Sequence, residues 1–331
     1  MAKTNKKKTK PSKKKTNSRR YVRGSDGETL RATLIALVII LVFVLALAGI
    51  VKLCGGFGGD EGGASNATAL AEGTVSVHFI DVGQADCILI ECPDGAVMID
   101  AGENDDSQKI CAYLNGHGIE RLNYVIGTHA HADHMGGMDD VILKYKVDEL
   151  IIPTKSSEDK FYRDVLEAAD RRRVPYRTAA EGETLKLPTG TLTVLDDGSE
   201  STAEQNRSEE LNNNSYVLKF TYGETAFLFT GDAENLYERE MIEKGERLDV
   251  DVLKVGHHGS NDATCYEFIR ATTPRYAVIQ VGRDNEYGHP SKKTVSRLEK
   301  AGVDIYRNDE LGDIIVTTDG RNISISSDVV N

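Results

Sequence analysis

The chain is poor in cysteine and has no paired cysteine motif. Five cysteines stand among its 331 residues, at positions 54, 87, 92, 111 and 265, and no Cys-x-x-Cys sequence occurs. Disulfide scaffolds use cysteines densely and in even numbers, so this odd and irregular set argues against such a scaffold. Cys87, Cys111 and Cys265 lie in apolar surroundings, and we expect them to be small residues of the hydrophobic core.

Positive charge is scarce beyond the N-terminus. Residues 1–31 contain twelve Lys and Arg against two acidic residues, which gives this segment a net charge of +10. The rest of the chain has 28 basic and 50 acidic residues, a net charge of −22. Affinity for nucleic acids comes largely from Lys and Arg that neutralise phosphates, so this acidic body disfavours a nucleic acid as substrate. The short basic run at 171–173 is expected to be a solvated helix end.

Residues 32–51 lack charge altogether and consist mainly of Leu, Ile, Val, Ala and Phe. A helix of this length spans roughly 30 Å, the hydrocarbon thickness of a bilayer, so we predict a transmembrane helix over residues 32–53. The basic segment 1–31 is then a cytoplasmic tail by the positive-inside rule, and the remainder is the extracellular part of a single-pass protein of the cell membrane. A cleaved signal peptide is the alternative, but the run is long for one and no A-x-A-like site follows it.

Residues 54–73 are expected to form a Gly-rich linker, and residues 74–331 one α/β domain. Strand-like and helix-like segments alternate along this domain. The expected strands are 75–80, 87–91, 96–99, 124–127, 149–152, 185–187, 192–195, 216–221, 225–230, 252–255, 276–281, 304–306 and 313–318. The expected helices are 107–114, 138–145, 157–172, 236–244 and 292–300. Strands with helices throughout, and hairpins at both ends, predict a four-layer αββα sandwich.

Three imidazoles and one carboxylate fall within six residues, as His129, His131, Asp133 and His134. Imidazole and carboxylate are the usual protein ligands of zinc and related ions, whereas a lone histidine is usually structural. In an extended loop His129 and His131 point to the same side and can share one ion, while Asp133 and His134 can hold a second. The glycines at 136–137 are expected to let the chain turn sharply after them.

Later segments supply further candidate ligands. Asp232 ends an apolar strand, where a carboxylate can bridge two ions, although Gly-Asp is also common in ordinary turns. His257 and His258 follow the next apolar strand, and His289 lies in a Tyr-Gly-His-Pro sequence. Six of the eight histidines fall in these three clusters, so a metal site explains them better than chance placement does.

The pattern H-x-H-x-D-H after a strand, then T-G-D, then a downstream histidine resembles the metallo-β-lactamase superfamily. More narrowly, four segments are similar to the hydrolase domain of ComEC competence proteins and to the related phosphorylcholine esterases. These segments are FIDVGQAD at 79–86, MIDAG at 98–102, LKVGHHGS at 253–260 and GHP at 288–290. The resemblance covers essentially all of residues 74–327 and implies a metallo-β-lactamase-like αββα fold.

The resemblance implies two ligand sets that share Asp232. One ion, Zn²⁺ with Mn²⁺ as the alternative, would be held by His129, His131 and Asp232. A second ion would be held by Asp133, His134, Asp232 and His258. Members of the superfamily often supply one more histidine to the first ion, but none occurs between His134 and Asp232. We therefore expect the first ion to be bound more weakly than the second. An amide of the segment 212–215, which occupies the corresponding region, or a water molecule would take the place of the missing histidine.

Other residues take roles by the same resemblance. The expected catalytic residues are His257, His289 and Asp133, of which the histidines contact the substrate or the leaving group. Asp100 would buttress the metal loop, and Asp81 would act beside it. The residues expected near the substrate or the rim are Asn213, Ser215, Ser260, Gln84, Asp86 and Asp81.

The implied reaction is hydrolysis of a phosphodiester by a metal-activated water, without a Ser or Cys nucleophile. A small or envelope-derived phosphodiester is the expected substrate, because the acidic body disfavours nucleic acid. Hydrolysis of a lactam, lactone or thioester is the first alternative. A non-catalytic envelope binding module is the second, although a nearly complete set of buried polar ligands argues against it.

Overall fold

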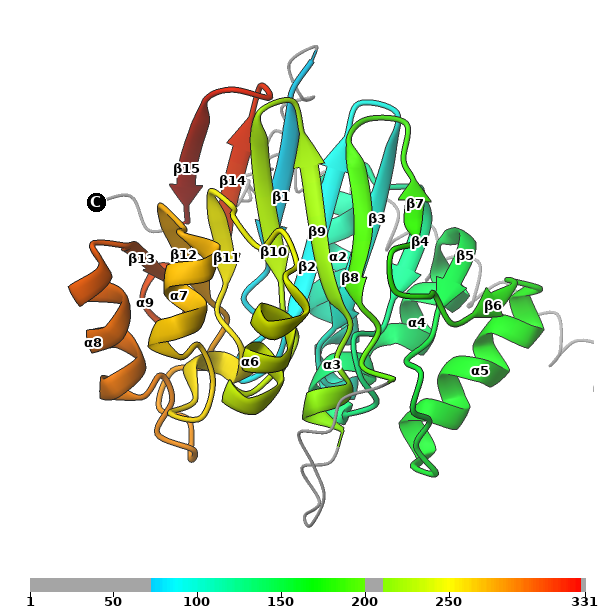
Figure 1. Ribbon diagram of the computed structural model, residues 1–331. Coiled ribbons are helices and arrows are strands. Elements are labelled where there is room, and N and C mark those ends of the chain that lie inside the picture. The colour runs from blue at the N-terminus through cyan, green and yellow to red at the C-terminus, as the bar shows by residue number, and fades with distance from the viewer. Residues whose placement is uncertain (1–72, 200–210, 329–331) are drawn as a thin grey trace, which may run out of the picture. The chain divides into compact units, whose positions relative to one another are not determined.

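Two β-sheets face each other in the computed structural model of the protein, which describes residues 73–199 and 211–328 (Figure 1). The first sheet has eight strands in the order β15-β14-β1-β2-β3-β4-β5-β6. Their bounds are β1 Val75–Phe79, β2 Cys87–Cys92, β3 Gly95–Ala101, β4 Arg121–Ile126, β5 Lys146–Ile151, β6 Tyr176–Arg177, β14 Ile314–Thr318 and β15 Ile323–Ser327. The strands from β3 to β6 run parallel, and the other neighbours pair antiparallel.

The second sheet has seven strands in the order β13-β12-β11-β10-β9-β8-β7. Their bounds are β7 Thr184–Lys186, β8 Thr191–Asp196, β9 Val217–Tyr222, β10 Thr225–Phe229, β11 Val252–Lys254, β12 Tyr276–Ile279 and β13 Asp304–Arg307. Here β10 to β13 run parallel, so both sheets are mixed. Parallel neighbours bring the carboxyl ends of successive strands to one edge, which is where the polar clusters of the sequence begin.

An apolar core fills the space between the sheets. In β1 the residues Val75, Val77 and Phe79 are fully buried in this core, together with Phe220 and Phe229 of the second sheet. Alternate side chains of a strand point to opposite faces, so the remaining β1 positions face the helices on the other side of the sheet.

Helices cover the outer face of each sheet (Figure 1). Over the first sheet lie α2 Ser107–Gly116, α4 Met138–Lys144 and α5 Lys160–Arg172, and over the second lie α6 Asn235–Lys244, α7 Tyr266–Thr272 and α8 Lys292–Ala301. Short turns complete the chain, namely η1 Asn104–Asp106, α3 Ala132–Met135, η2 Asn212–Asn214, η3 His257–Gly259 and α9 Asn308–Leu311. The outer helices and two mixed sheets agree with the predicted αββα layers.

Some elements differ from the expectation. The helix α7 was not predicted, because seven residues show little of a helical period. The edge strand β15 was also not predicted, although Ile and Ser alternate along it. Helix α5 begins at Lys160 rather than at residue 157, after Asp159, whose backbone is extended. The three residues before it remain outside the helix.

The predicted basic tail, transmembrane helix and linker over residues 1–73 lie outside the described residues, apart from the last one. Among residues 73–199 and 211–328, no helix is both long enough and apolar enough to span a bilayer. Cys87, Cys111 and Cys265 are free and buried, as expected for core residues, and so is Cys92. Burial raises the pKa of both Cys92 and Cys265 to about 12, which keeps these thiols unreactive.

Candidate metal centre

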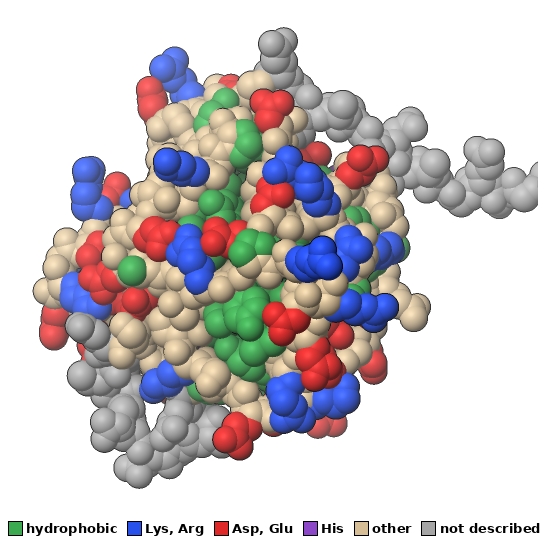
Figure 2. Space-filling model, turned by 90° about the vertical axis from the view of Figure 1, so that its right-hand side faces the viewer, with side chains coloured by type: hydrophobic (Ala, Val, Ile, Leu, Met, Phe, Trp, Pro, Cys, Tyr) green, Lys and Arg blue, Asp and Glu red, His purple; other side chains and the backbone are tan. Residues whose placement is uncertain are grey.

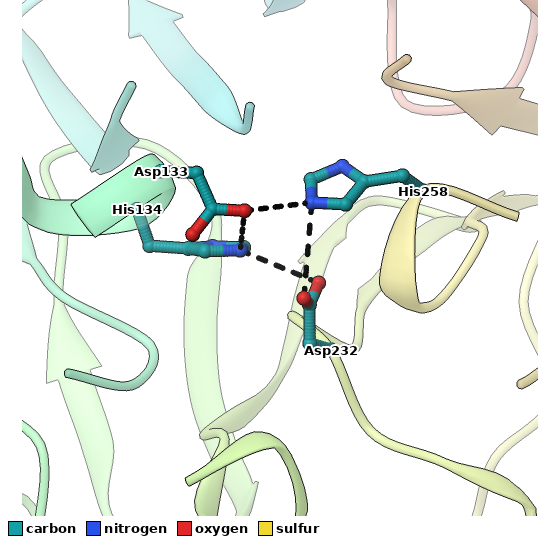
Figure 3. Close-up of side chains that lie close together, drawn as sticks. All are labelled: Asp133, His134, Asp232 and His258. Atoms are coloured by element: carbon teal, nitrogen blue, oxygen red, sulfur yellow. Dashed lines mark hydrogen bonds and ion pairs between the residues drawn. The ribbon is translucent and has the colours of Figure 1, made fainter. Parts of the chain in front are cut away.

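The cluster of predicted ligands forms where β4, β10 and β11 end. Asp133 and His134 follow β4 of the first sheet, whereas Asp232 and His258 follow β10 and β11 of the second. Figure 3 shows these four side chains pointing toward one another from the two sides. The site therefore depends on the packing of one sheet against the other.

The segment that follows β4 bends at residues 128–130, where His131 N donates to His129 O at 3.1 Å. His131 has an extended backbone and precedes the single helical turn α3, in which Met135 N donates to His131 O at 3.0 Å. The expected extended loop is therefore wrong between His129 and His131, although the two rings do lie on one side, with 2.9 Å between His129 Nε2 and His131 Nδ1. Asp133 and His134 project from the helical turn α3. This turn aims both side chains at the second sheet.

The role expected for the glycines at 136–137 needs correction. Gly136 has helical backbone angles, with φ of −60° and ψ of −42°, so it makes no sharp turn. A β-carbon at Gly136 would lie 2.5 Å from Asn104 N, and one at Gly137 would lie 2.6 Å from Ala101 O. These glycines are thus required by close packing of the metal segment against the end of β3.

Asp232 is fixed by its neighbours rather than by an ordinary turn. Gly231 before it has a φ of +49°, which favours glycine, and a β-carbon there would lie 2.8 Å from Ser215 Oγ. The same Ser215 hydroxyl accepts a hydrogen bond from Asp232 N at 3.1 Å. The Asp232 carboxylate is consequently buried and directed at the histidines.

The four side chains lie within ligand distance of a common point. His134 Nε2 is 3.4 Å from Asp232 Oδ1 and 3.8 Å from Asp133 Oδ2. His258 Nε2 is 3.2 Å from Asp133 Oδ2 and 3.7 Å from Asp232 Oδ2. One ligand atom from each residue falls within 4.8 Å of the others. This is the set expected for the second ion.

The far nitrogen of each imidazole is held by an oxygen acceptor. His134 Nδ1 donates to Asp100 Oδ2 at 2.8 Å, and His258 Nδ1 donates to the carbonyl of Gln280 at 3.0 Å. Both rings therefore turn Nε2 toward the cluster, where an ion that displaced the proton on Nε2 would meet its lone pair. Histidines that bind metals are usually oriented in this way.

Buried polar atoms at the centre have no other partner among the described residues. His134 Nε2 and Asp232 Oδ1 are buried and make no hydrogen bond in that part of the chain. Burial opposes charging of His134, but Asp232, Asp100 and Asp133 outweigh it and raise the pKa of the ring well above its usual range. The carboxylates thus favour a positive charge at the centre of the cluster, and imidazole nitrogens with carboxylate oxygens are suitable ligands for a divalent transition-metal ion.

The other predicted ligand pair is arranged differently. His129 Nε2 and His131 Nδ1 are 2.9 Å apart and share a hydrogen bond, while His129 Nε2 is 4.0 Å from Asp232 Oδ2. Burial lowers the pKa of His129 well below its usual range, which keeps the ring neutral. An ion held by both rings would replace their mutual contact. The expectation that this ion is the less secure remains a prediction.

A cavity of about 370 Å³ opens beside the cluster, and His257 and His289 line it as expected. His257 Nδ1 is 3.4 Å from Glu234 Oε1, and its Nε2 is 3.8 Å from Asp232 Oδ2. The rings of His257 and His289 meet edge to face at 5.6 Å, and the exposed Tyr287 stacks on His289. Burial and the nearby histidines lower the pKa of His289 to about 4, so this ring is neutral.

The structure brings some of the remaining predicted residues to the cavity and leaves others out. Gln84 and Ser260 line it. Ser215 does not, because it is fully buried and its hydroxyl accepts a hydrogen bond from Asp232 N. Asn213 Oδ1 accepts from Glu234 N at 3.0 Å, and Asn212 lines the cavity in its place. Asp81 pairs with the exposed Lys109, away from the cluster.

Two aspartates expected near the rim or the metal loop lie beneath the cluster. Asp100 accepts from both the backbone N and the hydroxyl of Thr128 at 2.8 Å, in addition to His134. Its φ of 57° is unusual for a residue other than glycine, which indicates a constrained position. Asp86 is 1 % exposed, so it is not a rim residue, and it lies 3.3 Å from His258 Nδ1.

Sequence reasoning missed several residues of the site. Lys254 is fully buried and forms an ion pair with Asp86, and Glu234 pairs with His257. Asn285 accepts from His289 N and donates to His289 O, which fixes the loop that carries this ring. Lys254 belongs to the segment LKVGHHGS, and its place at the buried end of an apolar strand was the available signal.

Comparisons with known proteins agree with this geometry. Residues 80–283 match the family model of the metallo-beta-lactamase superfamily. The chain is similar to ComE operon protein 3 of Bacillus subtilis, at 30% identity over 72% of this chain and 32% of that protein. It is also similar to competence protein ComA of Neisseria gonorrhoeae, at 28% identity over 74% of this chain and 32% of that protein. The chain thus spans about a third of the length of these relatives.

Among solved structures, a metallo hydrolase from the archaeon Ignicoccus hospitalis is similar at 14% identity, with a TM-score of 0.49, over 74% of this chain and 98% of that one. The family match covers the strands and loops that carry His129, His134, Asp232 and His258. The chain therefore belongs to the metallo-β-lactamase superfamily, as a metal-dependent hydrolase related to the hydrolase domain of ComEC proteins.

Proposed function

We propose that this protein is a membrane-anchored phosphodiesterase that uses one or two divalent ions, Zn²⁺ or Mn²⁺, to cleave a small phosphodiester outside the cell. The observation that carries the proposal is the buried convergence of Asp133, His134, Asp232 and His258 beside an open cavity. His129 and His131 would hold the first ion with Asp232. The ions would supply an activated water and polarise the scissile bond.

The surrounding side chains have separate tasks in this proposal. His257, positioned by Glu234, lies at the mouth of the cluster and would donate a hydrogen bond or a proton to the leaving group. His289 is neutral and would contact the substrate beside it. The exposed ring of Tyr287 would cover the substrate from the solvent side, since it stacks on His289.

The charge of the cavity supports a small substrate. Its lining includes Glu234 and Asp262 besides the ligand aspartates, and no Lys or Arg of the described residues lines it. A polyanion would find no side-chain cations there to neutralise its further phosphates. Figure 2 shows the face at the α5 end of the molecule, where Lys and Arg are interspersed with Asp and Glu rather than gathered into a basic patch.

The proposed location follows from the sequence. Residues 32–53 would cross the cell membrane once, with the basic tail 1–31 in the cytoplasm and the hydrolase domain outside. An envelope-derived phosphodiester is the substrate class that such a domain would meet. Protease accessibility of an epitope near residue 331 in intact cells tests this topology, and protection of that epitope would contradict it.

The test of function uses the full chain, purified in detergent and loaded with Zn²⁺ or Mn²⁺. The substrates are bis-4-nitrophenyl phosphate, a phosphorylcholine ester, single-stranded DNA, a lactam and a thioester. We expect turnover of a small phosphodiester, loss of it in Asp232→Asn, and normal turnover in the surface control Asp170→Asn. Turnover of the lactam or thioester alone would select the alternative hydrolase. Absence of bound metal, with all variants equal to the parent, would point to a binding module.

A further inference from the structure

A second group of metal-ligating side chains lies outside the hydrolase site, between the β1–β2 hairpin and helix α2. His78 is on β1, Glu91 is on β2, and His117 directly follows the end of α2. His78 faces α2 because its neighbours Val77 and Phe79 point into the core between the sheets. Ser76 is the direct partner of Glu91 in the ladder, so His78 and Glu91 are diagonal neighbours on one face.

The three side chains converge on one small volume. His78 Nε2 is 3.1 Å from Glu91 Oε2, and His117 Nδ1 is 3.6 Å from the same oxygen. One ligand atom from each residue lies within 4.8 Å of the others. A tetrahedral ion with bonds of about 2.1 Å holds its ligand atoms about 3.4 Å apart, so the observed spacing suits one ion.

The orientation of His78 supports a ligand role. This side chain is 2 % exposed, and its Nδ1 is hydrogen-bonded to the hydroxyl of Tyr113 at 2.9 Å. Its Nε2 makes no hydrogen bond among the described residues, although Glu91 is near, because the two atoms are not aligned for one. A buried imidazole that is held at one nitrogen and unpartnered at the other has the arrangement of a metal ligand.

The protonation states also suit an ion. Burial lowers the pKa of His78. Burial also opposes ionisation of Glu91, but the nearby imidazoles of His117 and His78 outweigh it and lower the pKa of Glu91 to about 2. His78 is therefore neutral and Glu91 ionised near neutral pH, as ligands must be. His117 is the most exposed of the three, at 25 %, which leaves room for water in a fourth position.

We propose that His78, Glu91 and His117 bind a divalent transition-metal ion, with Zn²⁺ as the probe ion, at a site separate from the hydrolase cluster. Two imidazoles, one carboxylate and an open position form a known donor set for such ions. Tyr113 is a positioning residue that holds the ring of His78. The site ties α2 to the β1–β2 hairpin and takes no part in hydrolysis.

The test counts metal ions on the purified full chain. Protein stripped with a chelator is titrated with Zn²⁺ and with Co²⁺, whose absorption reports coordination. We expect His117→Gln to bind one equivalent fewer than the parent while keeping its hydrolytic rate. The matched control Gln108→Ala, on the exposed side of the same helix, should bind the full number. Tyr113→Phe should keep the equivalent but bind it about 10- to 100-fold more weakly.

Equal stoichiometry and affinity in His117→Gln and Gln108→Ala would overturn the proposal. So would loss of every equivalent in a variant that carries both Asp232→Asn and His258→Ala, because the separate site should survive there. Circular dichroism of each variant shows whether it is folded. His117 is partly exposed, so its replacement gives an answer even where Glu91→Gln fails to fold.

Discussion

Two clusters of histidine and carboxylate lie in this molecule, and they are supported in different ways. In the hydrolase cluster four ligands come from both sheets, and two further buried aspartates, Asp86 and Asp100, stand behind the histidines. In the cluster of His78, Glu91 and His117, a single carboxylate meets two imidazoles between a hairpin and its covering helix. The neutral Tyr113 is hydrogen-bonded to Nδ1 of His78, as the carboxylate of Asp100 is to Nδ1 of His134 in the first cluster.

This difference teaches what each cluster can do. The hydrolase cluster contains four carboxylates around buried imidazoles, and their negative charge must be balanced by positive charge. Lys254 balances Asp86. Such a centre suits two ions and a reaction that develops negative charge. The smaller cluster has a single carboxylate, which suits one ion, and none of its residues lines the cavity. Variants can test this contrast at several levels.

The largest expected effect is on catalysis. Asp232→Asn removes the carboxylate that faces His134, His257 and His258, and we expect the hydrolytic rate to fall at least about 1,000-fold, which corresponds to about 4 kcal/mol. His117→Gln should leave the rate within about twofold, since His117 does not line the cavity. Steady-state kinetics on the phosphodiester substrate decides between them. A similar loss in both variants would remove the distinction between the clusters.

The next effect is on folding stability. Lys254→Met leaves the buried Asp86 carboxylate without its cation, and we expect a loss of about 3–5 kcal/mol in the free energy of unfolding. The control is Lys109→Met, which breaks an exposed pair with Asp81 and should change stability little. Urea unfolding of both metal-free variants provides the measurement. Equal midpoints would show that Lys254 does not stabilise the supports of the cluster.

A smaller effect concerns how tightly metal is held. Asp100→Asn keeps a side chain that tolerates the positive φ at this position but removes the charge behind His134. We expect the affinity of the hydrolase cluster for Zn²⁺ to fall about 10- to 100-fold. Competition with a chelating dye measures this affinity. Tyr113→Phe should leave the hydrolase cluster unchanged, and a matching loss there would mean that the two clusters are coupled.

The smallest effect is a dependence of stability on pH. Burial opposes ionisation of Glu91, but the nearby imidazoles of His117 and His78 lower its pKa from 4.5 to about 2 in the folded chain. Stability from this group is therefore complete above about pH 4.5 and is lost as the pH falls toward 2. Between pH 2 and 4.5 the free energy of unfolding should therefore change by on the order of 1–2 kcal/mol less in Glu91→Gln than in the parent. Thermal unfolding in chelator from pH 2 to 6 tests this, and parallel curves for parent and variant would contradict it.

The sequence predicted the hydrolase cluster because its ligands are local and follow apolar strands. His129 to His134 occupy one short segment, and Asp232 and His258 each end a buried strand. The second cluster left no such signal, since residues 78, 91 and 117 are far apart and meet only through strand pairing and helix packing. The pairing of Asp86 with Lys254 could not be predicted for the same reason, because a buried ion pair depends on contacts between the two sheets.

For the fold, too, the sequence predicted the regular elements but not the short turns and close contacts. Alternating apolar residues predicted most strands and the long helices, and the layers followed from their order. The turn α3 was missed because four residues are too few to show a helical period. The close approach of Gly136 to Asn104 was also invisible, as it arises from the packing of η1 against the metal segment.

The ligands of the hydrolase cluster extend from His129 to His258, across both sheets. A chain still emerging from the ribosome therefore lacks Asp232 until β10 has been made, and it lacks His258 until β11 and η3 have followed. Metal can be bound in full only after the second sheet has closed on the first. Bound metal will in turn favour the folded chain over any partly assembled one, by an amount that rises with the concentration of the free ion.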